Sequence, residues 1–351
     1  MRVKPFAALR PPKNLVEQVA SPPYDVLDSA EALAIAGDKS LLHITKPEID
    51  FSPMLPDNDP KVYRKAIDNF AEWQKKGYLV RDSKPCYYVY AQTMGERTQY
   101  GFVLCAHCDD YAKGLIKKHE LTRKDKEDDR MVHVNIQSAN IEPVFFAFRT
   151  QRELEDILYK TASSEPEYDF TDENGFGHKF WVISDDALIE RITELFSDRV
   201  DAFYIADGHH RSAAAARVGE ERAAANPSHR GDEEYNYFMA VCFPDDQLKV
   251  MDYNRVVKDL NGLVPSQIIG MLGEHFDIMC QGESVYAPSE LHTFSMYLEG
   301  KWYELKARPD TYHGADLVES LDVSILSKYV LDEILGIKDL RRDPRIDFVG
   351  G

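Results

Sequence analysis

Apolar and polar residues alternate in paired runs along the chain, and each pair surrounds a short turn. In the first pair the turn is Met94-Gly95-Glu96-Arg97, and in the last it is Glu299-Gly300-Lys301. Alternation with a period of two on both sides of such a turn predicts a β-hairpin. The hairpins predicted in this way comprise residues 86–93 with 99–107, 236–243 with 247–254, and 293–298 with 302–307.

Other stretches repeat their apolar residues every three or four positions, which predicts amphipathic helices. The clearest example has Val62, Ala66, Phe70 and Trp73 on one face and ends at Gly77. Further helices are predicted at 28–36 (with Asp28 or Ser29 as the cap), 151–160, 185–196, 266–275 and 321–335. Short apolar runs predict strands or extended segments at 3–9, 41–45, 143–149, 180–183 and 202–206.

Hairpins interspersed with helices predict an α+β fold with mixed or antiparallel sheets rather than a doubly wound parallel sheet. The chain has 351 residues, enough for one large domain or two ordinary ones. A polar stretch at 163–177, which contains Pro166, Gly175 and Gly177, is the predicted soft boundary. This boundary separates an N-terminal part, residues 1–165, from a C-terminal part, residues 166–351.

The composition, with 44% hydrophobic and 29% charged residues, is typical of a globular protein. The net charge of −18 argues against a general nucleic-acid-binding protein, because such proteins need a basic face. No apolar stretch is long enough to span a bilayer, and the N-terminal residues lack the apolar core of a signal peptide. We therefore expect a cytoplasmic protein with no nucleic acid and no membrane among its partners.

The chain has five cysteines, an odd and sparse set that does not indicate a disulfide framework. Cys105-Ala106-His107-Cys108 has the spacing of half a zinc or redox site. The sequence has no second Cys-x-x-Cys to complete four ligands, and the motif lies in an alternating run. Packing within a strand is therefore the favoured interpretation.

Candidate chemistry is concentrated at one predicted strand-to-helix turn, Asp207-Gly208-His209-His210-Arg211. Gly208 can adopt the positive φ of a tight turn, and the alanine-rich run that follows favours a helix. A helix N-terminus attracts anions, above all phosphate, and Arg211 adds a fork of donors that suits phosphate oxygens. Asp207 offers a carboxylate for Mg²⁺ or for a proton, and the histidines add donors or metal ligands. The alternative is structural: Asp207 caps the helix, and the histidines pack or face water.

A strongly charged stretch at 117–130 offers further groups for a phosphate site. Lys118, Arg123 and Arg130 are candidate cations, which a polyphosphate needs. Glu120 is a candidate carboxylate because it lies close behind an apolar turn rather than in the middle of the charged run. The alternative is that these mixed charges form a solvated face.

Two other segments present polar side chains that suit a ligand. Ser21-Pro22-Pro23-Tyr24-Asp25-Val26 cannot be helical, because its prolines hold the preceding residues extended. This rigid loop can present Tyr24 and Asp25 to a pocket, and a plain proline-rich connection is the alternative. Arg255, at the end of a predicted strand, suits a carboxylate or a phosphate, and a surface ion pair is the alternative.

The turn from Asp207 to Arg211, followed by small helix residues, resembles the signature of ParB/sulfiredoxin-fold proteins, specifically the free-serine kinase branch. That branch phosphorylates the hydroxyl of free L-serine with a nucleotide donor, whereas ParB proteins carry Gly-Glu-Arg-Arg at this turn and bind CTP. The predicted order of strand, helix, strand, turn and helix also resembles the ParB/sulfiredoxin core. The sequence has no Gly-x-x-x-x-Gly-Lys-Ser/Thr loop, so a Walker-type nucleotide site is not expected.

Nearly the whole chain resembles the large bacterial DUF1015 family. Relatives in that family continue with a further strand–helix segment, which implies that this chain is truncated after Gly351. The stretches that carry the resemblance are residues 21–26, 118–123, 206–211, 253–260 and 345–351.

These resemblances and the residues together imply a phosphotransferase that acts on the hydroxyl of a small metabolite, with free L-serine as the best candidate. ATP or ADP is the expected phosphoryl donor and Mg²⁺ the expected metal ion. Asp207 and Glu120 are the expected catalytic carboxylates, and Asp207 is the expected metal ligand. The remaining assignments are Gly208, His209, His210, Arg211, Lys118 and Arg123 for the nucleotide phosphates, and Arg255, Tyr24 and Asp25 for the substrate.

The alternative is a nucleotide-binding switch of the ParB type, which binds CTP or ATP without metabolite kinase activity. A metabolite-binding or phosphate-ester-cleaving protein would use the same anion site, and the oligomeric state stays open, a homodimer included. Replacing Arg211 by alanine is expected to weaken nucleotide binding about ten- to a hundred-fold. The same change is expected to leave thermal stability unchanged or slightly raised, because a helix N-terminus disfavours a cation.

Overall fold

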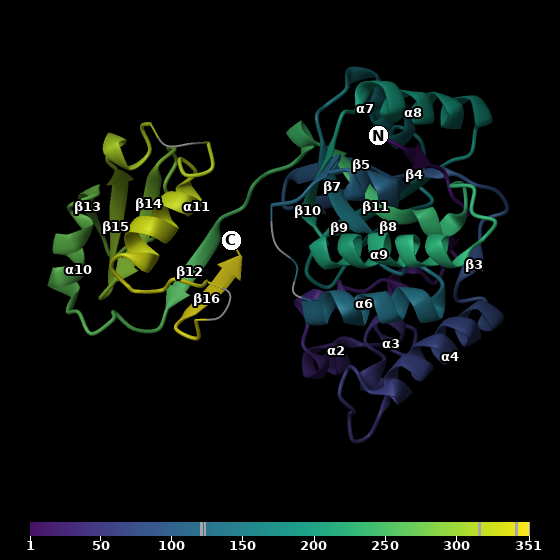
Figure 1. Cartoon of the computed structure of the whole chain (residues 1–351), viewed down its shortest axis with the longest axis horizontal. Helices are drawn as coiled ribbons and strands as arrows, with labels where there is room; N and C mark the ends of the chain where they lie inside the picture. Colours follow the sequence, from purple (N-terminus) through teal and green to yellow (C-terminus); the bar gives the residue numbers. More distant parts are fainter. Residues whose placement is uncertain (120–121, 123, 315–316, 341–342, 351) are drawn as a thin grey trace. The chain divides into compact units, whose positions relative to one another are not determined.

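The computed structural model describes residues 1–119, 122, 124–314, 317–340 and 343–350 (Figure 1). The chain divides into two compact units, Met1–Lys249 and Val250–Gly351. The predicted soft boundary at 163–177 lies inside the first unit, where β8 (Tyr168–Thr171) and β9 (Gly177–Ile183) extend the main sheet. Backbone pairing across this stretch ties it into the unit, although its composition is that of a linker.

The first unit is built around a mixed sheet, in which the described residues form nine strands. The strand order is β6-β10-β7-β11-β5-β4-β9-β8, and β1 also pairs with β5. The β6–β10 and β7–β11 pairs are parallel and the others antiparallel, so the predicted α+β class is confirmed. The remaining strands are β1 (Val3–Lys4), β4 (Tyr87–Met94), β5 (Arg97–His107), β6 (Ile116–Lys117), β7 (Val144–Phe148), β10 (Phe203–Asp207) and β11 (Tyr237–Pro244).

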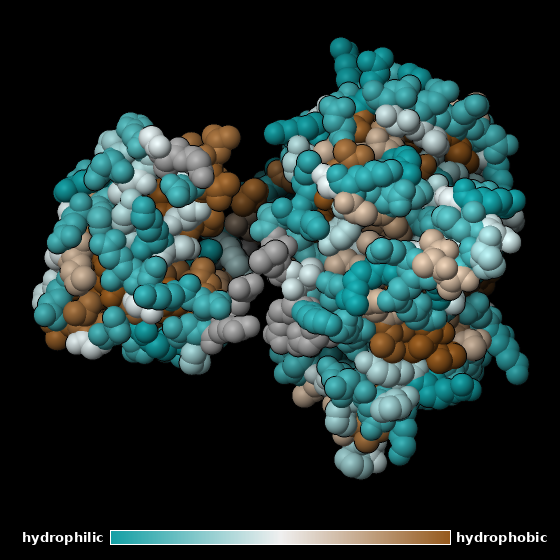
Figure 2. Space-filling model, in the orientation of Figure 1, coloured by the Kyte–Doolittle hydropathy of each residue, from teal (hydrophilic) through white to brown (hydrophobic). Residues whose placement is uncertain are grey.

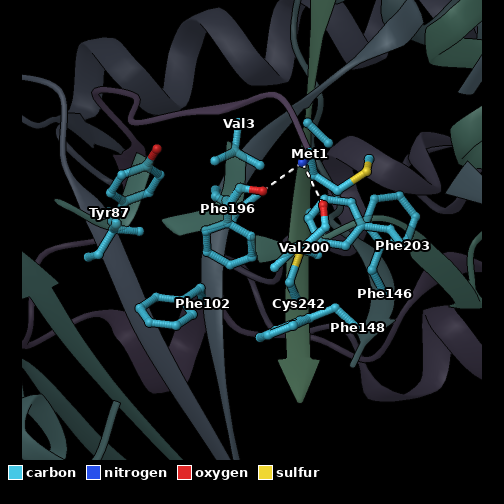
Figure 3. Packing of buried hydrophobic residues seen from close by; sticks show 14 of the residues in the cluster. Met1, Val3, Tyr87, Phe102, Phe146, Phe148, Phe196, Val200, Phe203 and Cys242 are labelled. Carbon is cyan, nitrogen blue, oxygen red and sulfur yellow. Dashed lines mark hydrogen bonds between the residues drawn. The ribbon is translucent and has the colours of Figure 1, made fainter. Parts of the chain in front are cut away.

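One face of this sheet is closed by the helices α7 (Arg152–Ala162) and α8 (Asp186–Arg199), which form the main core with it. Phe102 and Phe146 are fully buried there. Figure 3 shows how the N-terminus enters the same core: the ammonium of Met1 donates to the carbonyls of Phe196 at 2.6 Å and Val200 at 2.7 Å. Burial lowers the pKa of this ammonium.

Helices on the other side of the sheet form successive layers, in which α9 (His209–Ala225) packs on α6 (Lys124–Gln137), and α6 packs on α4 (Pro60–Lys76) (Figure 1). The predicted helix from Val62 to Trp73 is confirmed as α4, and Gly77 ends it with a φ of 72°. The shorter elements of this region are α1 (Val16–Val19), α2 (Ser29–Ile35), α3 (Leu42–Thr45), α5 (Cys108–Ala112), β2 (Leu9–Arg10) and β3 (Val80–Arg81).

The predicted cap of α2 is confirmed at Asp28. The Asp28 carboxylate accepts from the Glu31 amide at 2.8 Å, and the Glu31 carboxylate accepts from the Asp28 amide at 2.8 Å. Because each side chain satisfies an amide that the first helical turn leaves open, this capping box fixes where α2 begins.

Two secondary-structure predictions are wrong. Residues 41–45, predicted as a strand, form α3, in which Ile44 packs on Val19 and Trp73 while Leu42 joins a separate cluster with Ala32. A short apolar run that is buried on two sides does not distinguish a strand from one turn of helix.

The predicted hairpin between 236–243 and 247–254 does not form. β11 already pairs with β5 on one edge and with β7 on the other, so no edge is left for a returning strand. The chain turns at Asp245–Gln247 instead, and β12 (Tyr253–Val257) pairs with β16 (Ile346–Gly350), about 90 residues farther along. The hairpins predicted at 86–93 with 99–107 and at 293–298 with 302–307 are confirmed as β4–β5 and β14–β15.

The second unit holds a three-stranded antiparallel sheet in the order β13-β15-β14 and its own apolar core. The helix predicted at 321–335 is present as α11, which continues into a π-helical segment, Leu326–Asp332. The other elements of this unit are α10 (Pro265–Leu272), α11 (Asp322–Ile325), β13 (Phe276–Gly282), β14 (Thr293–Leu298) and β15 (Lys301–Ala307).

The face of the molecule drawn in Figure 2 is largely hydrophilic, with small apolar patches between polar side chains. This agrees with the high share of charged residues, 29% of the chain. Within the described residues, no helix is both long enough and apolar enough to cross a membrane.

Replacing Gly219 in α9 by alanine is expected to destabilise the first unit by about 1–3 kcal/mol. The added Cβ would lie 2.8 Å from the Tyr235 carbonyl oxygen and 3.0 Å from the Cys108 sulfur. The matched control is Gly270→Ala in α10, where the new Cβ meets nothing within 4 Å. That control should gain about 0.5–1 kcal/mol of helix propensity. Urea unfolding measures both variants, and a Gly219→Ala protein as stable as the wild type would refute the close packing of α9.

Candidate functional site

The predicted strand-to-helix turn is present between β10 and α9. β10 ends at Asp207, Gly208 has a φ of 88°, and α9 begins at His209. Only glycine adopts this conformation without strain, so Gly208 sets the angle at which α9 leaves the sheet. The N-cap position of α9 is occupied by Gly208, so Asp207 is not at the cap position that the structural alternative requires.

Arg211 lies at the centre of the polar groups around this turn. One of its terminal nitrogens donates to the Pro143 carbonyl at 2.6 Å, and the other donates to Asp207 at 2.6 Å and lies 3.3 Å from Asp25. The Arg211 side chain is only 11% exposed, whereas that of Asp207 is 59% exposed. The guanidinium is thus held inside the protein, while one of its carboxylate partners faces the solvent.

The proline-rich loop brings Tyr24 and Asp25 to the same place. The Tyr24 amide donates to Glu142 at 2.9 Å, and the guanidinium of Arg130 lies 3.9 Å from the centre of the Tyr24 ring. Arg130 is itself paired with Asp129. The structure therefore joins the predicted residues Tyr24, Asp25, Asp207, Gly208, His209, His210 and Arg211 in one region of the first unit.

Glu142 is a member of this group that the sequence did not point to. Burial raises the pKa of its carboxyl to about 7, although the nearby Arg211 and Arg130 favour the ionised form. The only sequence signal was a single acidic residue between Ile141 and Pro143, directly before an apolar strand. A carboxyl group with a pKa near neutrality is suited to accept and release protons.

The other predicted site residues are placed differently. The Lys118 ammonium lies 4.4 Å from the centre of the Tyr111 ring. The ring of the next residue, His119, which the sequence did not assign to the site, meets the His209 ring nearly at right angles with the centroids 4.4 Å apart. Glu120 and Arg123 lie outside the described residues, so their predicted roles stay predictions.

Arg255 belongs to the second unit and not to the part of the chain that holds the turn. Its guanidinium donates to the Tyr253 carbonyl and lies 5.7 Å from the centre of the Phe348 ring. Burial lowers the pKa of Arg255. Its predicted role in binding the substrate therefore receives no support from the geometry of the first unit.

A large cleft opens beside these groups, with a volume of about 2060 Å³. Asp207 and Arg211 line one part of it, and Ala215, Val218 and Arg222 continue the lining along α9. The floor is the second face of the main sheet, on which Tyr88 and Val241 are buried while Tyr90, Val103 and Phe145 are half-buried. The cleft-facing residues of the strands include Tyr88, Tyr90, Val103, Phe145, His178, Phe180, Met239 and Val241.

The residues around Asp207 suit a magnesium ion better than a caged metal. No group of three or more His, Cys, Asp or Glu side chains that could hold a metal ion occurs among the residues described. Mg²⁺ in nucleotide sites needs only one or two carboxylates, because phosphates and water supply the other ligands. The exposed carboxylate of Asp207 meets that requirement.

The Cys-x-x-Cys pair is buried and packed. The Cys108 sulfur lies 3.6 Å from the Ala215 carbonyl and 3.7 Å from the Tyr235 carbonyl. Burial raises the pKa of Cys105 and of Cys108 to about 12. Both thiols are therefore protonated and packed, which agrees with the favoured interpretation of the motif.

A family described as a protein of unknown function (DUF1015) matches residues 3–324, which is most of the chain. The chain belongs to the DUF1015 family. The match includes the proline-rich loop, the charged stretch and the turn of this DUF1015 protein, and ends before residues 345–351. No curated protein and no solved structure matches the chain. The resemblance of the turn to ParB/sulfiredoxin-fold proteins and to free-serine kinases therefore stays a prediction.

Replacing Glu142 by glutamine tests the buried carboxyl group. Its pKa is raised from 4.5 to about 7 in the folded protein, so its ionisation opposes folding as the pH rises through this range. The glutamine variant cannot ionise and should gain about 2 kcal/mol relative to the wild type between about pH 5 and about pH 8.

The measurement is urea unfolding of both proteins at the two pH values. Glu221→Gln, at an exposed position on α9, is the control and should show no such gain. If the difference in the free energy of unfolding between Glu142→Gln and the wild type did not change with pH, the Glu142 carboxyl would be in contact with water and not buried.

Proposed function

We propose that this protein is a nucleotide-dependent phosphotransferase that moves a phosphoryl group to the hydroxyl of a small metabolite. The observation that carries the proposal is the meeting of a helix N-terminus at Gly208, a buried guanidinium and an exposed carboxylate at one end of a large cleft. Phosphoryl transfer needs positioned donors for the phosphate oxygens and a carboxylate beside the attacking hydroxyl. The resemblance of the turn to free-serine kinases makes L-serine the first substrate to test, with ATP or ADP as the donor.

The first turn of α9 supplies the phosphate-binding groups. Gly208 at the N-cap position has no side chain to cover this end of the helix, and the helix dipole favours negative charge there. Arg211 is already bonded to Asp207 and Asp25, and a phosphate must replace at least one of these carboxylates. Asp207 is the one that can leave, because it is exposed, whereas the Pro143 carbonyl holds the guanidinium in place during the exchange.

Carboxylates are proposed for the two remaining roles, which are binding of the metal ion and activation of the substrate hydroxyl. Asp207 is the proposed ligand of Mg²⁺, which when bound would neutralise charge on the transferring phosphoryl group. Asp207 or Glu120 orients the substrate hydroxyl and receives its proton. Glu142 is the further candidate for the proton, because its pKa of about 7 lies near the working pH of a general base.

The loop of Tyr24 and Asp25 suits an amino-acid substrate. Asp25 is 34% exposed beside Arg211, so its outer face is available to an ammonium group. The Tyr24 amide is fixed by Glu142, and the Tyr24 ring by Arg130, which gives the loop a defined shape before a ligand arrives. Arg255, which lies in the second unit, stays the sequence-based prediction for the substrate carboxylate.

The function is tested with Asp207→Asn. The wild type, incubated with Mg²⁺ and ATP or ADP, is screened against free amino acids and small alcohols for nucleotide consumption and for a phosphorylated product. The variant should lose at least about a hundred-fold in turnover, because an amide neither binds Mg²⁺ well nor accepts the proton.

Asp201→Asn, at an exposed position just before β10, is the control and should keep full activity. If the wild type neither binds nor consumes any nucleotide, the phosphotransferase proposal fails. If Asp207→Asn remains fully active, the turn is not the catalytic site.

Arg211→Ala should weaken ATP binding about ten- to a hundred-fold through the loss of a charge-assisted contact. The structure changes the sequence-based expectation for its stability, because Arg211 is buried and satisfies Asp207, Asp25 and the Pro143 carbonyl. Its loss should now lower the stability by about 2 kcal/mol. Calorimetric titration and thermal unfolding of the same variant measure the two effects. Unchanged ATP binding with lowered stability would assign Arg211 to the scaffold alone.

One observation favours the second candidate function, a nucleotide-binding switch. Arg211 ties the proline-rich loop to α9 through Asp25, so a phosphate that displaces Asp25 would release that loop. A switch would bind CTP or ATP without consuming it and would change shape or oligomeric state. Sedimentation of the protein with and without each nucleotide, compared with the turnover assay, distinguishes the switch from the kinase.

A further inference from the structure

A second chain of polar contacts lies in the cleft, away from the turn. The Asp172 carboxylate is 3.3 Å from Nε2 of His178, and Nδ1 of His178 is 2.7 Å from the hydroxyl of Tyr90. All three residues line the cleft, and they come from the β8–β9 turn, β9 and β4. The proposed phosphotransferase reaction uses none of them.

The backbone holds Asp172 in one orientation. Its Oδ1 accepts from the amides of Asn174 and Phe176, both at 2.9 Å, and Gly175 turns the chain with a φ of 82°. Burial opposes ionisation, but these hydrogen bonds and the one from His178 outweigh it and keep the pKa of Asp172 below its ordinary value. Asp172 is therefore an ionised acceptor aimed at His178.

This arrangement determines which way the protons point. An ionised Asp172 only accepts, so Nε2 of a neutral His178 carries the proton and donates it. Nδ1 of His178 must then accept the hydrogen of the Tyr90 hydroxyl. With that hydrogen committed, the Tyr90 oxygen offers only lone pairs to the cleft, and a ligand must meet it with a donor.

Aromatic rings surround this acceptor. His178 stacks on Phe170 and on Tyr90, with centroids 5.0 and 6.0 Å apart, while Phe180 stacks on Tyr88 and on Tyr168 at 5.2 and 5.3 Å. Tyr88 and Tyr168 are buried, whereas the half-buried rings of Tyr90, Phe170, His178 and Phe180 line the cleft. Parallel rings beside a fixed acceptor suit a flat heteroaromatic ring that carries a donor at its edge.

The sheet connects this aromatic end of the cleft with the turn. Asp207 is in register with Phe145, Phe145 with Val241, Val241 with Val103, and Val103 with Tyr88. Registered neighbours share one face of a sheet, so the row from Phe145 to Tyr88 crosses the cleft floor, and at its other end the register shifts between Ile205 and Asp207. Four strand spacings of about 4.8 Å, combined with a step of two residues along β4 from Tyr88, place Tyr90 roughly 20 Å from Asp207. An extended nucleoside triphosphate with its contacts can bridge such a span.

Building on the proposed nucleotide dependence, we propose that the aromatic end of the cleft binds the base of the nucleotide. Its phosphates then lie at the N-terminus of α9, and its base stacks on the rings of β4, β8 and β9. Tyr90 selects bases whose edge carries an amino group, adenine or cytosine, over the matching bases with a carbonyl oxygen there, hypoxanthine or uracil. A carbonyl oxygen at the edge of the base would face the lone pairs of the Tyr90 oxygen. Neither of these two acceptor atoms would then receive a hydrogen bond.

The test compares matched nucleotides by calorimetric titration. The wild type should bind ATP about ten-fold more tightly than ITP, or CTP about ten-fold more tightly than UTP, the difference that one buried hydrogen bond makes. Tyr90→Phe keeps the ring and should lose this preference. His178→Phe keeps a stacked ring but frees the hydrogen of Tyr90, and it should lose the preference as well. Binding of inorganic triphosphate, which has no base, should be unchanged in both variants.

Tyr297→Phe, at an exposed ring in the second unit, is the control and should keep the wild-type preference. Equal binding of ATP and ITP and of CTP and UTP by the wild type would overturn the base site, as would a preference that survives in both variants. Failure of the wild type to bind any nucleotide would instead overturn the proposed function. Thermal unfolding shows whether each variant is folded, and either of the two cleft variants suffices for the comparison.

Discussion

The guanidinium of Arg211 is buried, and a buried cation is stable only when acceptors surround it. Its acceptors come from three segments that are far apart in the sequence: Asp25 in the proline-rich loop, the Pro143 carbonyl before β7, and Asp207 at the end of β10. Satisfying one charge therefore fixes the loop, the strand and the helix relative to one another. The candidate site exists where these segments meet, and Tyr24 and Glu142 enter it because they are attached to the same segments.

The two faces of the main sheet explain why the site has a cleft beside it. Phe102 and Phe146 point to the face that α7 and α8 close, and they are fully buried. Their neighbours Val103 and Phe145 point to the other face and are only half-buried. On that face Tyr88 is buried in a small cluster, but half-buried apolar and aromatic side chains line the cleft beside it. A ligand with a flat apolar part gains from covering them, while its polar part reaches the groups around Arg211.

The sequence predicted those elements whose partners are close along the chain. The β4–β5 and β14–β15 hairpins, the α4 helix and the Asp28 cap depend on local alternation, periodicity and capping, and these features are visible in the residues themselves. The pairing of β12 with β16 could not be predicted, because the choice between that partner and β11 depends on which sheet edges other strands already occupy.

The candidate site shows the same limit. The turn at Gly208 was visible in the sequence, since a positive φ requires glycine and the alanine-rich helix follows it. Glu142 was not, because its raised pKa results from burial by segments distant in sequence. The contact between Tyr90 and His178 likewise depends on the register of β4 against β9 and leaves no local pattern.

The balance of charge around Arg211 bears on the form in which a nucleotide can bind. Asp25, Asp129 and Asp207 already neutralise the guanidinium groups of Arg211 and Arg130. A bare polyphosphate would therefore approach a region without excess positive charge, on a protein whose net charge is −18. A magnesium complex of the nucleotide carries less negative charge and offers the displaced Asp207 a cation in exchange for Arg211. Under the proposed function, the carboxylates that are paired with Arg211 thus make nucleotide binding depend on the metal ion.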